Sequence, residues 1–224
     1  FGKTKIGDLR RSDVKRWHSL VGAKRGHYAA NRALAVLRKI LSLAVKEWEL
    51  AAVNVATGVA MFPETKREAF GTDADLVALG AYLAAAEADG RASAAFCNAV
   101  RLLALSGMRL GEVLGLERSS VDFQAWVIRL EDAKAGARSV PMPARVRDLL
   151  AGIPKSGRTV RFLFGADAKG ERPISPGEFR TGWRHMRAAT GLASLRPHDL
   201  RHGAATFGAQ AGANAFLLRD YLGH

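Results

Sequence analysis

Apolar residues recur at helical spacing along the first fifty residues of the chain. A first helix is predicted from Asp8 to about Leu20, and a second from His27 to about Leu50. The second shows the clearer pattern, because its apolar side chains recur at i, i+3 and i+4 and so form one buried stripe. Members of that stripe are Ala30, Leu34, Leu37, Leu41, Ala44, Val45 and Trp48.

A change of composition separates this helical region from the rest of the chain. Residues 54–71 contain Gly58, Pro63 and Gly71 among mixed charges, which is typical of a connecting segment. Thr72 is then a suitable N-cap for a helix through Ala86. A further helix over about 92–105 presents Phe96, Val100 and Leu103 on one face and stops at Gly107.

The pattern next changes to period two. Residues 126–130 and 138–142 predict the strands of a β-hairpin with Lys134 near its tip. Helices are predicted again beyond it, starting at the Ser175-Pro176-Gly177-Glu178 capping sequence, at Pro197 and after Asn214. The expected fold class is therefore mainly α with a small antiparallel β-sheet (α+β).

The charge of the chain points to a polyanionic partner. Its 224 residues have a formal net charge of +13, and residues 1–68 hold 14 Lys and Arg against 6 Asp and Glu. Arg32, Lys39 and Lys46 recur every seven residues beside the apolar stripe, joined by Arg38. A solvated helix face would explain this pattern, but the excess of positive charge favours a DNA-binding surface.

Cysteine content and hydropathy restrict the cellular context. Cys97 is the only cysteine, so no internal disulfide is expected, and a buried core thiol is its simplest role. No apolar stretch is long enough for a transmembrane helix, and no signal peptide precedes the first helix. We therefore expect a cytoplasmic protein with no membrane partner. Because the chain opens on Phe1 and not Met, upstream sequence is expected to be missing.

The most specific signal is a set of arginines and histidines with no carboxylate pair. Arg196-Pro197-His198-Asp199-Leu200-Arg201-His202 places His198 and Arg201 on one helix face, and Leu222-Gly223-His224 ends the chain. Arg109 lies about ninety residues upstream, within Ser106-Gly107-Met108-Arg109-Leu110-Gly111-Glu112. Guanidinium groups match phosphate oxygens, so the set is suited to holding a phosphate.

Two other interpretations of local motifs are weaker. His198 and His202 at i, i+4 are the spacing of a zinc pair, yet Arg201 lies between them and no third ligand is evident. Gly2-Lys3-Thr4 matches only the end of a phosphate-binding loop, and the apolar helix that should follow is absent. We expect neither a metal nor a nucleotide cofactor.

In order and spacing, the Arg109 segment, Lys134, the His198–His202 segment and Leu222-Gly223-His224 resemble the tyrosine recombinase (phage integrase) family. The resemblance covers residues 72–224 closely and residues 6–62 more loosely, since Asn54-Val55 stands where the family often has Asn-Pro. It implies three parts: a partial helical core-binding, DNA-binding domain (1–62), a linker (63–71) and a catalytic domain (72–224).

The family resemblance also implies roles for single residues. Arg109 and Arg201 would clamp the scissile phosphodiester, and Lys134 would protonate the departing 5′ oxygen. His198 would act as general base or hydrogen-bond donor, and His224 would hold a non-bridging oxygen. Supporting roles would fall to Glu112, which would buttress an arginine, and to His202, which would pack behind the site.

In this family the nucleophile is a tyrosine shortly after the Leu-Gly-His histidine, which forms a 3′-phosphotyrosyl intermediate without ATP or metal. No tyrosine follows His224, and Tyr221 precedes it on an apolar face. We therefore expect a chain truncated before its nucleophile, which binds double-stranded DNA without cleaving it.

The resemblance implies a full-length enzyme that works as a homotetramer on DNA, with DNA-bending accessory proteins as possible further partners. Without the C-terminal segment, this chain is expected to be monomeric. Two alternatives remain open: a topoisomerase-like or telomere-resolving enzyme of the same chemistry, and a non-catalytic DNA-binding regulator with the recombinase fold.

Overall fold

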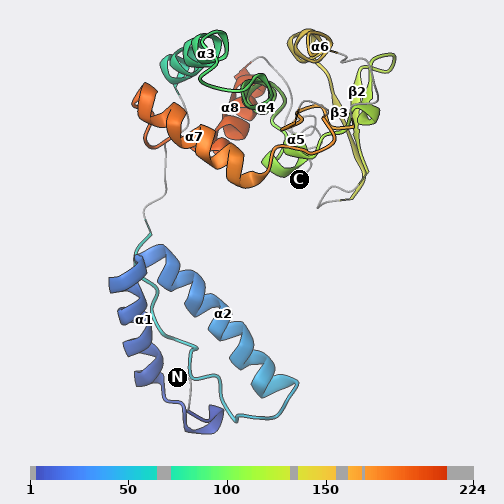
Figure 1. Cartoon of the computed structure of the whole chain (residues 1–224). Helices are drawn as coiled ribbons and strands as arrows, with labels where there is room; N and C mark the ends of the chain where they lie inside the picture. The colour runs from blue at the N-terminus through green and yellow to red at the C-terminus, as the bar shows by residue number, and fades with distance from the viewer. Residues whose placement is uncertain (1–3, 65–71, 132–135, 155–160, 168–169, 211–224) are drawn as a thin grey trace. The chain divides into compact units, whose positions relative to one another are not determined.

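A computed structural model describes residues 4–64, 72–131, 136–154, 161–167 and 170–210 of the chain. The chain forms two compact units, residues 1–67 and 68–224, so the division falls inside the predicted linker. The prediction of a mainly helical fold with a small antiparallel sheet is confirmed (Figure 1). Within the described residues, no helix is long and apolar enough to cross a membrane.

The first unit is built on two packed helices, α1 (Arg11–Arg25) and α2 (His27–Lys46), preceded by the 3-10 turn η1 (Ile6–Asp8). Gly26 joins them with a φ of 86°, a left-handed conformation that favours glycine and allows the chain to reverse sharply. Helix α2 ends four residues before its predicted limit at Leu50. Its core stripe is largely as predicted, because Ala30, Leu34, Leu41 and Ala44 are buried.

The segment after α2 belongs to this unit, although the composition of residues 54–62 is typical of a connecting segment. Residues 54–62 run back along the helix pair (Figure 1), and Ala56 and Val59 are buried in the same core as Leu34 and Leu41. Asn54 donates from Nδ2 to the Ser42 hydroxyl, 2.8 Å away. Tertiary packing therefore orders a stretch whose composition is that of a loop.

The last described part of this segment is fastened by aromatic stacking and one amide. The Phe62 ring stacks between His18 and His27, with ring centroids 4.4 and 4.3 Å away. Buried Asn31 accepts from the Phe62 backbone N–H at 3.0 Å and donates to the Phe62 carbonyl at 2.9 Å and to Glu64 Oε1 at 2.7 Å. These contacts fix the place where the chain leaves the helix pair.

The second unit is organised around α4 (Ala94–Ser106), which packs against α3 (Asp73–Ala88), α5 (Leu110–Leu114), α6 (Ala144–Ala151) and α8 (Pro197–Gln210). Both predicted caps are confirmed. Thr72 Oγ1 accepts from the Asp75 N–H at 3.2 Å, and Gly107 ends α4 in the left-handed conformation with a φ of 59°. Buried residues occur along almost the whole length of α4, and this helix therefore forms the centre of the core.

A three-stranded antiparallel sheet lies beside these helices, in the order β1 (Val121–Asp122), β2 (Val127–Leu130), β3 (Arg138–Pro141). The predicted hairpin is confirmed with Leu130 opposite Arg138, whereas the short β1 was not predicted. Helices α5 and α6 were also missed, because five and eight residues are too few to establish a helical period.

Two further elements belong to the described part of the second unit. Helix α7 (Pro176–Thr190) starts at Ser175 as predicted and packs against α3. The short 3-10 turn η2 (Arg118–Ser120) precedes β1. The helix predicted after Asn214 lies outside the described residues.

Candidate active site

Arg109 is held at the junction of two helices. Helix α4 ends at Gly107, Met108 is buried as an anchor, and Arg109 is the N-cap residue of α5. Glu112, in the first turn of α5, accepts from the Arg109 backbone N–H at 2.8 Å and from Arg109 Nη1 at 2.9 Å. One carboxylate therefore contacts both the backbone and the guanidinium of Arg109.

Arg201 reaches the same junction from α8. Its neighbour Leu200 packs into the core, and Arg201 itself is 4% exposed. Arg201 Nη1 donates to the Gly107 carbonyl at 2.6 Å, a contact between residues 94 positions apart in sequence. The two arginines that sequence motifs singled out therefore lie at one site.

A third arginine joins them. Arg138, the first residue of β3, donates from Nη2 to Glu112 Oε2 at 2.7 Å, and only 10% of each side chain is exposed. The sequence motifs give Arg138 no role. A cationic residue at the loop end of the predicted hairpin was the available signal, but its partner lies 26 positions away.

The electrostatics of the site follow from this crowding of charge. Burial lowers the pKa of the Arg201 guanidinium, and the positive charges of Arg109 and Arg138 lower it further, against the opposing effect of Glu112. Burial by itself would raise the pKa of Glu112, but hydrogen bonds from Arg109 and the nearby Arg138 outweigh it and hold this pKa below its ordinary 4.5. Two guanidinium groups thus contact one ionised carboxylate and a third lies within its electrostatic reach, a combination suited to attracting an anion.

Two histidines of α8 are paired on the surface. The rings of His198 and His202 meet edge to face, with centroids 4.6 Å apart, and both residues are exposed. His202 therefore contacts His198. It is exposed to solvent, whereas a residue that packs behind the site would be buried. Among the described residues, no group of three His, Cys, Asp or Glu side chains is placed to hold a metal ion.

Two predicted site residues, Lys134 and His224, lie outside the described residues, as does Tyr221. Their roles stay predictions. Within the described residues, the structure brings Arg109, Glu112, Arg138 and Arg201 together. His198 and His202 lie near the start of α8, the helix that carries Arg201.

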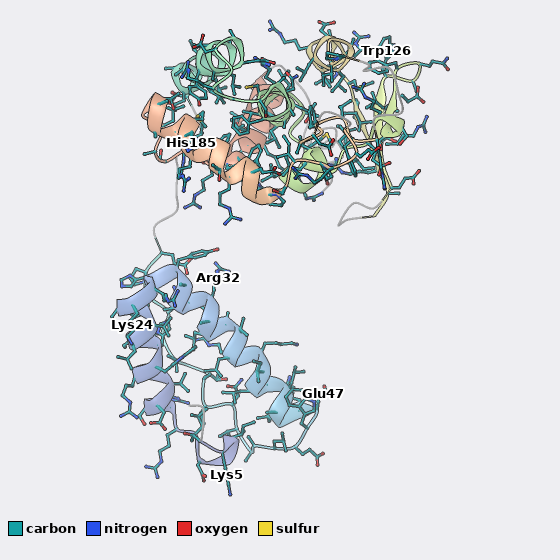
Figure 2. All side chains as sticks on the ribbon, in the orientation of Figure 1. Lys5, Lys24, Arg32, Glu47, Trp126 and His185 are labelled. Carbon is teal, nitrogen blue, oxygen red and sulfur yellow. The ribbon has the colours of Figure 1, made fainter. Side chains whose placement is uncertain are left out.

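The predicted DNA-binding residues of α2 differ in their surroundings. Arg38 donates from Nε to the Ala56 carbonyl at 3.2 Å and from Nη2 to the Val59 carbonyl, so it holds the returning segment in place. Arg32, Lys39 and Lys46 are exposed. The guanidinium of Arg32, near the start of α2 (Figure 2), lies 4.8 Å from the centroid of the Tyr28 ring. DNA contact by these three residues stays a prediction.

Comparison with known proteins identifies the family. Residues 76–224 match the phage integrase family, and the chain belongs to it. A relative, the tyrosine recombinase XerC of Rhodospirillum centenum, is 38% identical over 123 residues, which are 53% of this chain and 36% of the relative. The tyrosine recombinase XerD of Ralstonia nicotianae is 28% identical over 209 residues, 87% of this chain and 65% of the relative. The chain thus spans between about a third and two thirds of these curated relatives.

Solved structures of integrases share the fold. The Tn1549 transposon integrase in complex with circular intermediate DNA superposes with a TM-score of 0.80 at 20% identity, covering 100% of this chain and 80% of that chain. A λ integrase dimer bound to a COC′ core site gives a TM-score of 0.78 at 16% identity, covering 99% and 81%.

Proposed function

We propose that this chain is the DNA-binding and phosphate-activating part of a site-specific DNA recombinase, which cleaves and rejoins DNA through a 3′-phosphotyrosyl intermediate. The observation that carries the proposal is the meeting of Arg109 and Arg201 at the Gly107 turn, with Glu112 orienting Arg109. Membership of the phage integrase family and the DNA-bound integrases of the same fold support it. The enzyme would act in the cytoplasm.

The charge balance of the site suits a phosphodiester. Arg109, Arg138 and Arg201 carry three positive charges, and Glu112 returns one negative charge. A phosphodiester has one negative charge, and its pentavalent transition state has an additional one, so an excess of positive charge favours the transition state over the ground state. Of Arg109 and Arg201, Arg109 is the more accessible, because 30% of its side chain is exposed. Arg201 is almost fully buried.

The remaining catalytic roles follow the family pattern. His198 lies on the first turn of α8, three positions before Arg201, and would serve as general base or hydrogen-bond donor at the same phosphate. Lys134 would protonate the departing 5′ oxygen, and His224 would bind a non-bridging oxygen. His202, in contact with His198, would orient that ring.

A tyrosine after the Leu-Gly-His sequence would be the nucleophile, as in the rest of the family. The chain has three tyrosines, and none of them follows His224. Tyr28 belongs to the first unit, and Tyr82 packs on the core of the second unit. The 224-residue polypeptide is therefore expected to bind double-stranded DNA as a monomer without forming a covalent bond to it.

The first unit would supply much of the DNA affinity. Arg32, Lys39 and Lys46 are exposed cations on α2, and phosphate contacts by such side chains are sequence-independent and weaken steeply with salt. The full-length enzyme would work as a homotetramer on two duplexes, with DNA-bending accessory proteins as further partners. A λ integrase tetramer bound to a Holliday junction has the same fold, with a TM-score of 0.75.

A covalent-trapping assay tests the proposal. A duplex bound by the chain is first selected from random sequences, and a nicked version is then incubated with the 224-residue chain or with the chain extended by its encoded downstream residues. We expect binding by both, and an adduct stable to denaturant only with an extension that supplies a tyrosine. Arg109→Ala should reduce adduct formation by roughly 100- to 1,000-fold.

The alternatives give different results in the same assay. An adduct formed by the 224-residue chain and lost in Tyr221→Phe would place the nucleophile before His224. Selective binding by an extended chain that never forms an adduct would instead identify a non-catalytic regulator.

A further inference from the structure

Arg138 connects the sheet to the arginine pair. It is the first residue of β3 and lies opposite Leu130, the last residue of β2, so its backbone closes the loop end of the β2–β3 ladder. Its side chain leaves the sheet and donates to Glu112 Oε2 on α5 at 2.7 Å. With 10% of the side chain exposed, this ion pair is largely shielded from water.

The Glu112 carboxylate is shared in a defined way. Its Oε1 accepts from Arg109 Nη1 at 2.9 Å, while its Oε2 accepts from the Arg109 backbone at 2.8 Å and from Arg138 Nη2 at 2.7 Å. A carboxylate held at both oxygens has a fixed plane, and that plane sets the direction in which the Arg109 guanidinium is held. If the Arg138 donor is removed, Glu112 loses one of the restraints on that plane.

The charge of Arg138 also reaches the arginine pair, since it acts on Arg201 together with Arg109. A third guanidinium close to two others carries an electrostatic penalty. A neutral hydrogen-bond donor could make the same structural contact with Glu112 at a smaller electrostatic cost. The use of a cation here suggests that its charge is needed at the site.

We propose that Arg138 is a positioning residue for the phosphate-binding arginines: it fixes the Glu112 carboxylate, which in turn orients the Arg109 guanidinium. Because Arg138 is also part of the β2–β3 ladder, the same contact links the position of this hairpin to the orientation of the Arg109 guanidinium. The assignment to phosphate binding rests on the proposed function. The orientation of Arg109 by Arg138 does not.

The order of the Arg109 side chain can be measured without any catalytic assay. In the 224-residue chain, the Nε–Hε signal of Arg109 is assigned by its loss in Arg109→Lys, and its ¹⁵N relaxation reports motion of the guanidinium. We expect a rigid Arg109 side chain in the wild type and a markedly more mobile one in Arg138→Met. Arg138→Lys, which retains the cation, should restore part of the rigidity.

Arg129→Met is the matched control. Arg129 lies on the neighbouring strand β2 and forms an ion pair with Asp122 at 2.6 Å, but this pair is more exposed and its carboxylate is not Glu112. The control loses the same kind of contact from the same sheet and should leave the Arg109 signal unchanged. A folded Arg138→Met protein in which Arg109 is as rigid as in the wild type would overturn the proposal. If that variant does not fold, Arg138→Gln is read in its place by the same criterion.

The cleavage assay gives a separate second readout. In a chain that forms the covalent adduct, Arg138→Met should slow adduct formation on the order of 100-fold at saturating DNA, because misplacement of a catalytic group by about 1 Å has an effect of that size. A methylphosphonate at the scissile position removes one negative charge. It should narrow the difference in adduct-formation rate between Arg138→Met and wild type, and the same is expected for Arg109→Ala. An unchanged difference would mean that Arg138 does not act through Arg109. If Arg109→Ala itself cleaves normally, the proposed function fails, while the relaxation result still decides the orientation of Arg109.

Discussion

Replacing Glu112 by alanine is the most informative single change in the second unit. Glu112 accepts three hydrogen bonds, two from Arg109 and one from Arg138, and its side chain is 10% exposed. Glu112→Ala removes a negative charge beside three guanidinium groups. The N–H donors of Arg109 and Arg138 then lose this acceptor in a site that is largely shielded from water. The variant should therefore be destabilised far more than by loss of a surface ion pair.

The size of the effect follows from the burial of the partners. Removal of one member of a buried ion pair costs about 3–5 kcal/mol, because the remaining charge is left uncompensated. Arg109 retains 30% exposure and regains some hydration, so we expect the lower end, about 3 kcal/mol. For a unit of this size, each kcal/mol lowers the melting temperature by roughly 2–4 °C, which gives a decrease of about 6–12 °C.

Urea and thermal unfolding, followed by tryptophan fluorescence and circular dichroism, measure this effect. Glu117→Ala is the matched control, since Glu117 pairs with Arg161 at 2.8 Å but the arginine side chain is 66% exposed. Its loss should cost no more than about 1 kcal/mol. A Glu112→Ala protein no less stable than this control would refute the reasoning that Glu112 holds the cluster together.

The stabilisation by Glu112 should depend on pH in a defined direction. Its pKa in the folded state is held below the ordinary 4.5, so the ionised form is favoured by folding. The stabilisation is therefore complete above about pH 4.5 and is lost as the pH falls through the folded-state pKa. The stability difference between wild type and Glu112→Gln should narrow over this acidic range, and a difference that widens there would contradict the assignment.

Three further changes test other parts of the molecule. In Gly22→Ala, the new Cβ would lie 2.7 Å from the Phe62 ring and displace it, so urea unfolding should show the first unit destabilised by about 1–3 kcal/mol. Lys39→Ala should leave stability unchanged and reduce the salt slope of DNA binding by about 1, whereas Arg38→Ala should destabilise this unit by about 1–3 kcal/mol through its unsatisfied carbonyls. Thr72→Ala removes the cap of α3 and should cost about 1 kcal/mol in thermal unfolding.

Local signals in the sequence were sufficient for much of the secondary structure. Helices α3 and α7 begin after N-cap residues that the sequence identifies, α4 ends at the predicted Gly107, and the β2–β3 hairpin follows from its period of two. These predictions succeed because capping and periodicity act over a few neighbouring residues. Helix α5 and strand β1 were missed because five and two residues hold too little of either pattern.

Local patterns along the chain predict the longer helices, the hairpin, the basic character and, through ordered motifs, the family. The fold was needed to show that Arg201 meets Gly107 across 94 positions, that Glu112 is shared by two arginines and that Ala56 and Val59 pack into the core of the first unit. Such contacts depend on which helix faces meet, and that is settled by packing of the whole core and not by any local pattern. For the same reason the sequence grouped Arg38 with its exposed neighbours, although the fold directs it to backbone carbonyls.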